Sequence, residues 1–115
     1  MDCIFCKIAN GQIPAEKVYE SENVLAFKDI SPVAPEHILI IPKKHISNID
    51  ELTGEDSAHM GELFIAAREI SKERILHEKG YRLIINNGKA AGQEVSHLHM
   101  HIIGGKDHLG PMILE

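Results

Sequence analysis

The chain has 115 residues, of which 43% are hydrophobic, and it carries a formal net charge of −5. This length supplies one hydrophobic core but not two ordinary domains, so we expect a single domain over residues 1–115. The 12 lysines and arginines form no dense run, which argues against a protein that binds a nucleic-acid backbone through charge. The composition is compatible with a ligand the size of a single nucleotide.

The sequence also bears on the cellular compartment. The longest aliphatic run, residues 38–41, is far shorter than the roughly 20 residues that cross a bilayer, and the first residues show no basic segment before an apolar one. We therefore expect a cytoplasmic protein without a membrane partner. Cys3 and Cys6 are too few for a disulfide framework, and their spacing is typical of two metal ligands or a redox pair.

The N-terminus predicts a short helix over residues 3–9. Asp2 is a candidate N-cap, and Phe5 and Ile8 share the apolar face that helical spacing creates. The Asn-Gly pair that follows is typical of a helix end.

Three predicted strands come next. Residues 17–20 and 23–29 form a candidate antiparallel hairpin, with Asp29 where the second strand ends. A connection stiffened by prolines leads to residues 36–41, which are rich in β-branched side chains and predict a buried strand with His37 at its start.

The middle of the chain predicts the one long helix. A Thr53 cap with an acid three residues later precedes apolar residues at helical spacing, and the helix should end before Gly80. Its apolar face comprises Met60, Leu63, Phe64, Ala67 and Ile70. Residues 81–86 then predict a strand, and residues 87–92 predict a tight loop rich in glycine and asparagine.

Residues 97–103 alternate histidine with apolar side chains at the spacing of a β-strand. Side chains at i, i+2 and i+4 point the same way, so His97, His99 and His101 should line one face while the apolar residues between them enter the core. The order of elements predicts an α+β fold around an antiparallel sheet.

This histidine row has three candidate uses. One metal does not fit all three rings, because the backbones of His97 and His101 would lie about 13 Å apart in a strand, whereas ligands about 2 Å from zinc must converge. A polar face turned to water would be served equally well by other strand formers. A nucleophilic role fits better, because a neutral imidazole offers a lone pair near pH 7.

The loop before the histidines supplies a candidate phosphate site. Asn86 and the backbone N–H groups after Gly92 are placed to hold phosphate oxygens as charge builds during an attack at phosphorus. The histidines outside the row and its neighbours are expected at the surface; these are His59, His77 and His108.

With these residues assembled, the chain resembles the histidine triad (HIT) family, whose signature is complete at residues 97–103. The likeness extends to residues 2–8, 25–32, 37–45 and 92–95. The short length and the Gly-Gly pair after the triad look like the branch of purine nucleoside phosphoramidases, the histidine triad nucleotide-binding proteins. The resemblance implies a HIT-type fold with an antiparallel sheet, one long helix and a short N-terminal helix, and hydrolysis of phosphoramidates of AMP.

The resemblance also implies a mechanism. His99 would attack the α-phosphate and form a nucleotidyl-histidine that water hydrolyses, and His101 would donate a proton to the leaving amine. His97 and His37 would be supporting members. A nucleophilic nitrogen must be unprotonated, so the other ring N–H of His99 needs an acceptor, for which we expect a backbone carbonyl.

A nucleotide site follows from the same likeness. The ribose hydroxyls would bind an acid at the end of the second strand, beside an apolar slot for a purine that leaves AMP and GMP both open. The implied nucleotide-binding residues are Asp29, Ile30, Phe5, Ile8, Asn86, Gly92, Gln93 and Glu94. Phe5 and Ile8 are equally well explained as ordinary core packing.

Cys3 and Cys6 resemble a pair that binds zinc in some bacterial relatives, with histidines matching His45 and His97. Two thiolates and two imidazoles would make a closed tetrahedral site, structural rather than catalytic, so no cofactor would be required for the reaction. Two buried free thiols are the alternative. The chain departs from the family pattern at Ser96, where relatives often carry an aromatic residue, and at Glu94, where some carry serine.

Three functions therefore stay open from sequence. The first is a phosphoramidase acting on purine nucleotides, the second a dinucleoside polyphosphate hydrolase, and the third a nucleotide-binding or signalling module with little turnover. Only an enzyme of this kind predicts a covalent intermediate on His99. The resemblance also implies a homodimer.

Overall fold

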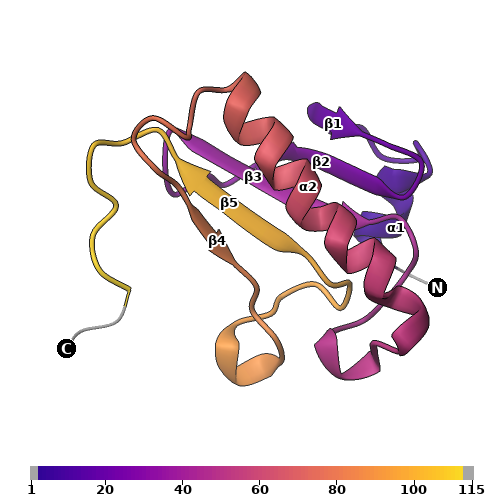
Figure 1. Ribbon diagram of the computed structural model, residues 1–115. Coiled ribbons are helices and arrows are strands. Elements are labelled where there is room, and N and C mark those ends of the chain that lie inside the picture. Colours follow the sequence, from indigo (N-terminus) through magenta and orange to yellow (C-terminus); the bar gives the residue numbers. More distant parts are fainter. Residues whose placement is uncertain (1–2, 113–115) are drawn as a thin grey trace.

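The computed structural model, described over residues 3–112, is an α+β fold in which one long helix lies across one face of a sheet (Figure 1). The five strands are ordered β1-β2-β3-β5-β4, and each neighbouring pair is antiparallel. They are β1 (Lys17–Glu20), β2 (Val24–Lys28), β3 (Glu36–Pro42), β4 (Arg82–Ile84) and β5 (Met100–Gly104). The predicted fold class is confirmed.

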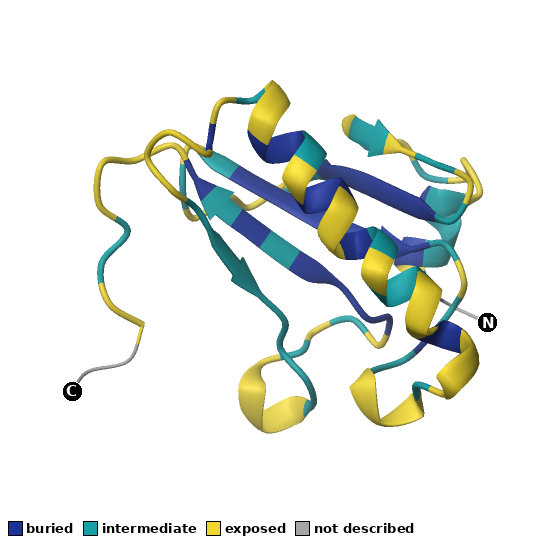
Figure 2. Cartoon of the chain, in the orientation of Figure 1, coloured by how far each residue is buried: buried dark blue, intermediate teal, exposed yellow. Residues whose placement is uncertain are grey.

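Two helices cover the two faces of this sheet. The long helix α2 (Ser57–Glu73) packs on one face, where the buried cluster contains Ile38, Ile40 and Ile102. The short helix α1 (Ile4–Ala9) packs on the other face through Phe5 and Ile8, as predicted. Figure 2 shows the central strands buried between these layers. Single 3-10 turns are η1 (Ile49–Glu51), η2 (Gly54–Asp56) and η3 (Lys89–Ala91).

Strand register decides which side chains share the α1 face. Leu39 in β3 pairs with Phe27 in β2 and with His101 in β5. Directly paired residues point to the same side of a sheet, and so do residues two apart in one strand, so His37 joins them. Met100 and Ile102 point the other way into the α2 core. The predicted separation of histidines from apolar residues is confirmed.

Two predicted strand boundaries were wrong. The last strand begins at Met100, so His97 and His99 lie in the irregular segment before it. The strand predicted at residues 81–86 is limited to Arg82–Ile84, because only these residues pair with β5. The long helix ends at Glu73, with Arg74 at the C-cap position, so the prediction that it ends before Gly80 is confirmed.

Two local predictions also need correction. Asp2 lies outside the described residues, and the N-cap of α1 is Cys3, whose sulfur accepts a hydrogen bond from the Cys6 N–H at 3.3 Å. Phe64 is 56% exposed, because the sheet covers a narrower stripe of α2 than the apolar spacing suggested. The predicted Thr53 cap is present, with its N–H donating to Asp56, but it starts the 3-10 turn η2 that leads into α2.

The remaining histidines differ in exposure. His77 and His108 are exposed as predicted, whereas His59 is half-buried and its Nδ1 has no hydrogen-bond partner. Within residues 3–112, no helix is both long and apolar enough to cross a membrane.

Candidate active site

His99 is held by the backbone of its own segment. Its Nδ1 lies 2.8 Å from the carbonyl oxygen of His97, and a carbonyl can only accept, so the ring hydrogen sits on Nδ1. The lone pair of the neutral ring is therefore on Nε2. The ring is 7% exposed and packs edge-on against Phe5, with centroids 5.1 Å apart. The predicted backbone carbonyl is confirmed, and the site has one imidazole with a defined nucleophilic nitrogen.

His101 is linked to His37 on the neighbouring strand. The Val33 N–H donates to Nδ1 of His37 at 3.2 Å, so His37 carries its ring hydrogen on Nε2. That Nε2 lies 2.9 Å from Nδ1 of His101, which must then be the acceptor. A neutral His101 is therefore protonated on Nε2.

The surroundings of His101 also affect its protonation. Burial, together with the nearby His99 and His37, lowers its pKa to about 4, although Asp29 acts in the opposite direction. Asp29 Oδ2 lies 3.5 Å from Nε2 of His37. In the ligand-free site at pH 7, His101 is therefore neutral.

The loop before the triad is held in shape by Gln93. Its Oε1 accepts from the Gly88 N–H, and its Nε2 donates to the carbonyls of Ser47 and Val95. Gly92 has a φ of +84°, a conformation that glycine adopts without a Cβ penalty. The side chain of Gln93 thus shapes the loop whose N–H groups are the candidate phosphate donors.

The other nucleotide-site residues differ in placement. Asp29 follows β2, and its Oδ1 accepts from the Ser31 N–H at 2.7 Å. Ile30 is 99% exposed, whereas Phe5 and Ile8 are buried in the α1 core, which agrees with their packing role. Asn86 is half-buried and Glu94 is exposed.

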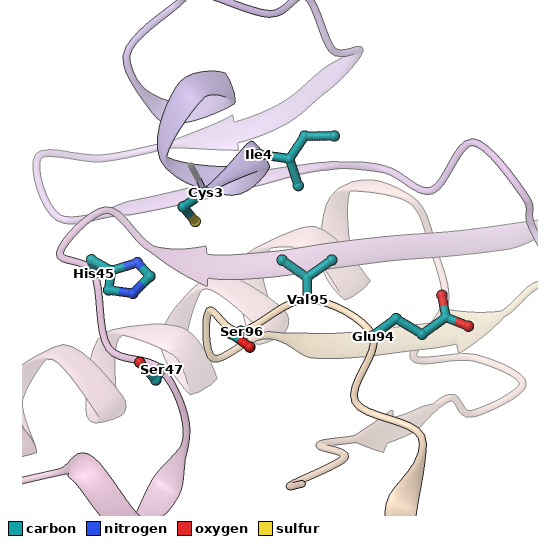
Figure 3. Close-up of a pocket in the computed structure, with 7 residues that line it drawn as sticks. All are labelled: Cys3, Ile4, His45, Ser47, Glu94, Val95 and Ser96. Carbon is teal, nitrogen blue, oxygen red and sulfur yellow. The ribbon is translucent and has the colours of Figure 1, made fainter. Parts of the chain in front are cut away.

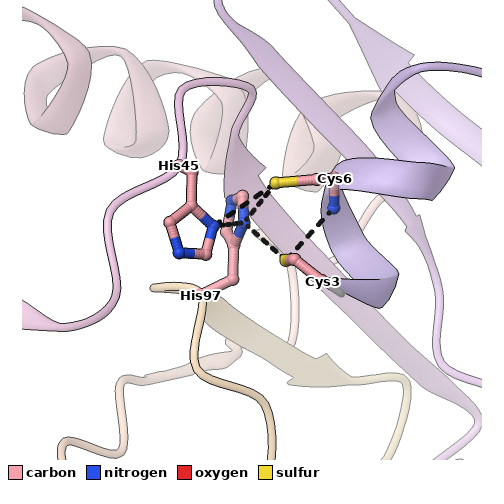
Figure 4. Close-up of side chains that lie close together, drawn as sticks. All are labelled: Cys3, Cys6, His45 and His97. Carbon is pink, nitrogen blue, oxygen red and sulfur yellow. Dashed lines mark hydrogen bonds between the residues drawn. The ribbon is translucent and has the colours of Figure 1, made fainter. Parts of the chain in front are cut away.

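A second cluster joins the N-terminal helix to the triad segment (Figure 4). Its members are Cys3, Cys6, His45 and His97, and their sulfur and nitrogen atoms all lie within 4.8 Å of one another. Measured pairs include Cys3 Sγ to His97 Nδ1 at 3.3 Å and Cys6 Sγ to His45 Nδ1 at 3.3 Å. Ligands of a tetrahedral zinc ion lie about 3.3–3.8 Å apart, so the donor set and its spacing fit that ion.

His97 is oriented as a metal ligand requires. Its Nε2 lies 2.8 Å from the carbonyl oxygen of Pro42, so the ring hydrogen sits there and Nδ1 presents its lone pair to the cluster. Burial, the largest effect, lowers the pKa of His97, which keeps the ring neutral. Burial, reinforced by the contact with Cys3, raises the pKa of the Cys6 thiol to about 11. The lone pair of His97 Nδ1 thus faces the sulfur atoms of both cysteines.

A hollow of about 340 Å³ lies on the outer side of this cluster (Figure 3). It is lined by Cys3, Ile4, His45, Ser47, Glu94, Val95 and Ser96. In Figure 3 the Glu94 carboxylate points away from Cys3 and His45. The hollow therefore flanks the cysteine and histidine cluster rather than His99 and His101.

Three polar groups that organise the site were missed from sequence. They are the Val33 N–H, the Pro42 carbonyl and the Gln93 amide acting on its own loop. Backbone groups carry no residue-type signal. The proline-rich connection directly before His37 was the one available hint that a fixed backbone group would lie beside that ring.

Comparisons with known proteins agree on one family. Residues 10–108 match the family model of the HIT domain. The purine nucleoside phosphoramidase of Escherichia coli K12 is 44% identical, with 97% of this chain and 93% of that protein covered. A HIT family hydrolase from Clostridium thermocellum has a TM-score of 0.93 and 48% identity, covering 98% and 97% of the two chains. A histidine triad protein from Clostridium difficile has a TM-score of 0.92 and 47% identity, covering 96% of each.

Proposed function

This chain belongs to the HIT family, and we propose that it is a hydrolase that cleaves the P–N bond of purine nucleoside phosphoramidates through a covalent nucleotidyl-histidine on His99. The observation that carries the proposal is the hydrogen bond from His99 Nδ1 to the His97 carbonyl. It leaves Nε2 as the nucleophilic atom of the neutral ring, so no proton has to leave that nitrogen before the attack. The likeness to the Escherichia coli phosphoramidase supports the choice of substrate class.

The phosphate would bind where the glycine-containing loop meets the triad segment. Backbone N–H groups after Gly92 can donate to phosphate oxygens, and Asn86 adds a side-chain donor. Gln93 supports this site by holding the loop in shape. At Glu94 we expect the backbone N–H, rather than the exposed carboxylate, to face the phosphate.

The nucleoside would lie along the α1 side of the sheet. Asp29 would accept hydrogen bonds from the ribose hydroxyls, with Ile30 beside the purine. Phe5 and Ile8 are largely buried, so they would form the floor of this slot and contribute packing more than direct contact. The slot would accept either purine, adenine or guanine.

We further propose that the cluster of Cys3, Cys6, His45 and His97 binds a structural zinc ion. The four donors would complete the coordination shell, so the ion would have no open position for substrate and would take no part in the reaction. It would instead fix α1 to the segment that carries His99. The donor spacing and the carbonyl bond to His97 support this assignment.

A homodimer is also proposed. Phe64 and Ile65 on α2 are 56% and 47% exposed, and β4 is an edge strand of the sheet. A second copy of the chain would remove this apolar surface from water. Light scattering coupled to size-exclusion chromatography tests the state, and Phe64→Glu should shift it toward the monomer.

The test of function compares AMP release from an adenosine phosphoramidate by the native protein and by His99→Ala, with AMP binding measured in parallel. We expect turnover to vanish in the variant while AMP still binds. Faster cleavage of a dinucleoside polyphosphate by the native protein would favour the polyphosphate hydrolase instead. AMP binding without turnover of either substrate would leave a binding module.

A further inference from the structure

Asp29, His37 and His101 form a cluster that the roles given above do not fully use. Their oxygen and nitrogen atoms all lie within 4.8 Å of one another, although the residues come from the end of β2, from β3 and from β5. Because the Val33 N–H occupies Nδ1 of His37, the Nε2 of that ring bears a hydrogen and has no lone pair for a metal. The cluster is therefore a hydrogen-bonded unit.

In the hydrogen-bonded arrangement that the structure shows, His101 can neither protonate the leaving amine effectively nor take a proton from water. Nε2–H of His37 donates to Nδ1 of His101, so His101 keeps its hydrogen on Nε2 and has no free lone pair. A neutral ring in this tautomer is a very weak acid toward a leaving amine, and it cannot take a proton from water. Both steps need His101 to carry a hydrogen on Nδ1, where His37 now donates.

Among the residues that the structure describes, Asp29 is the one acidic group that acts on His101. Its Oδ2 lies 3.5 Å from Nε2 of His37, and its Oδ1 is fixed by the Ser31 N–H. The charged or titratable groups that act on His101 are His99 in its own segment, His37 on β3 and Asp29 after β2. Of these, only Asp29 favours a positive charge on the ring.

We propose that Asp29 is the counter-ion that lets His101 act first as an acid and then as a base, in addition to the ribose role on which this inference builds. When His101 is an imidazolium, Nε2–H of His37 and Nδ1–H of His101 both turn to the Asp29 carboxylate. Nε2–H of His101 is then free to serve the reaction. Asp29 is in this respect a positioning residue, since it acts through His101.

The proton balance closes over the cycle. His99 Nε2 forms a bond to phosphorus as the P–N bond to the amine breaks, and the amine nitrogen keeps that electron pair and takes the proton from Nε2 of His101. His101 is then neutral with its hydrogen on Nδ1, held by Asp29. In the second step Nε2 takes a proton from water as the hydroxide bonds to phosphorus, and the electrons of the P–N bond return to His99.

The kinetic test removes the ribose contact from the comparison. Native protein, Asp29→Asn and the matched surface variant Glu22→Gln are assayed on an adenosine phosphoramidate and on its 2′,3′-dideoxy analogue. We expect Asp29→Asn to lower kcat on the dideoxy analogue by about 10²-fold, and to move the alkaline limb of kcat to lower pH. Equal kcat for native protein and Asp29→Asn on that analogue would overturn the proposal, because a ribose role alone predicts this result.

A second measurement decides the question without turnover. Nitrogen-15 NMR of the ligand-free protein follows the tautomer and the titration of His101 in the three proteins. Asp29→Asn should lower the His101 midpoint by about one pH unit, whereas Glu22→Gln should leave it in place. An unchanged midpoint in Asp29→Asn overturns the counter-ion role. Failure of the native protein to cleave any phosphoramidate would instead count against the proposed function.

Discussion

The Nδ1 atom of His99 lies 2.8 Å from the carbonyl oxygen of His97, while Nε2 of His97 itself lies 2.8 Å from the carbonyl of Pro42. Two residues of one segment thus have opposite ring nitrogens protonated. His99 presents Nε2 as a nucleophile, and His97 presents Nδ1 to the cysteines. The same short segment therefore serves two chemistries because the backbone sets each tautomer.

A trapped intermediate would identify the nucleophile directly. Native protein mixed with an adenosine phosphoramidate and denatured in alkali should contain molecules heavier by one adenylyl group, because the P–N bond to His99 survives those conditions. Mass spectrometry of the peptide that contains His99 locates the group. His99→Ala should show no adduct and should lose about 10⁴-fold or more in kcat. An adduct of equal yield in His99→Ala would place the nucleophile elsewhere.

Much of the fold followed from periodicity, because alternation along a strand fixes which face a side chain occupies. Periodicity could not predict that His101 lies beside Leu39, because that pairing depends on the register between β3 and β5. For Phe64, the burial predicted from helical spacing was wrong. Helical spacing identifies an apolar stripe, but the width of the stripe that the sheet covers is a tertiary property, and Phe64 falls outside it.

In the candidate site, too, the sequence predicted the residue types but not their spatial arrangement. The residue types that could hold a metal were visible in sequence, but only the fold brings Cys3 to His97 across 94 positions. The tautomers of His37 and His97 depend on Val33 N–H and on the Pro42 carbonyl, which are backbone groups without a sequence signature. Gln93 was expected at the nucleotide, and the structure shows its amide holding the loop.

Zinc should stabilise the native protein. We expect about one zinc ion per chain by elemental analysis, and a strong chelator should lower Tm by several degrees, because an ion bound only by the folded state adds its binding free energy to stability. Cys6→Ser should melt at a lower temperature and respond little to the chelator. Identical melting of zinc-loaded native protein with and without the chelator would contradict a structural zinc site.

Acid should weaken the fold through His101. The folded-state pKa is about 4, below the ordinary value of 6.5, so the unfolded chain binds this proton first as pH falls. Stability from the neutral ring is complete above about pH 6.5 and is lost as pH falls toward about 4, amounting to about 2–3 kcal/mol once the partial exposure of the ring to solvent is allowed for. Urea unfolding at several pH values should show a flatter dependence for His101→Asn than for native protein. Parallel curves would show that another group controls the acid response.

Ile75 should limit the stability of the α2 end. It occupies the left-handed region with φ +57°, and the turn around it satisfies the last carbonyls through Leu76 N–H to Ser71 at 2.7 Å and its own N–H to Lys72 at 3.3 Å. Glycine is the usual residue at this position, because a β-branched side chain there costs about 1–2 kcal/mol. Since Ile75 is 57% exposed, little burial is lost on replacing it.

Ile75→Gly should therefore raise the free energy of unfolding by about 1 kcal/mol, after the added flexibility of glycine in the unfolded chain is subtracted. Ile75→Ala is the matched control, since it removes the same exposed apolar atoms but keeps a Cβ. Urea unfolding should rank glycine above alanine. If alanine is equally stabilising, the gain comes from removing the branched side chain rather than from relieving the left-handed backbone, and the strain assigned to this turn is absent.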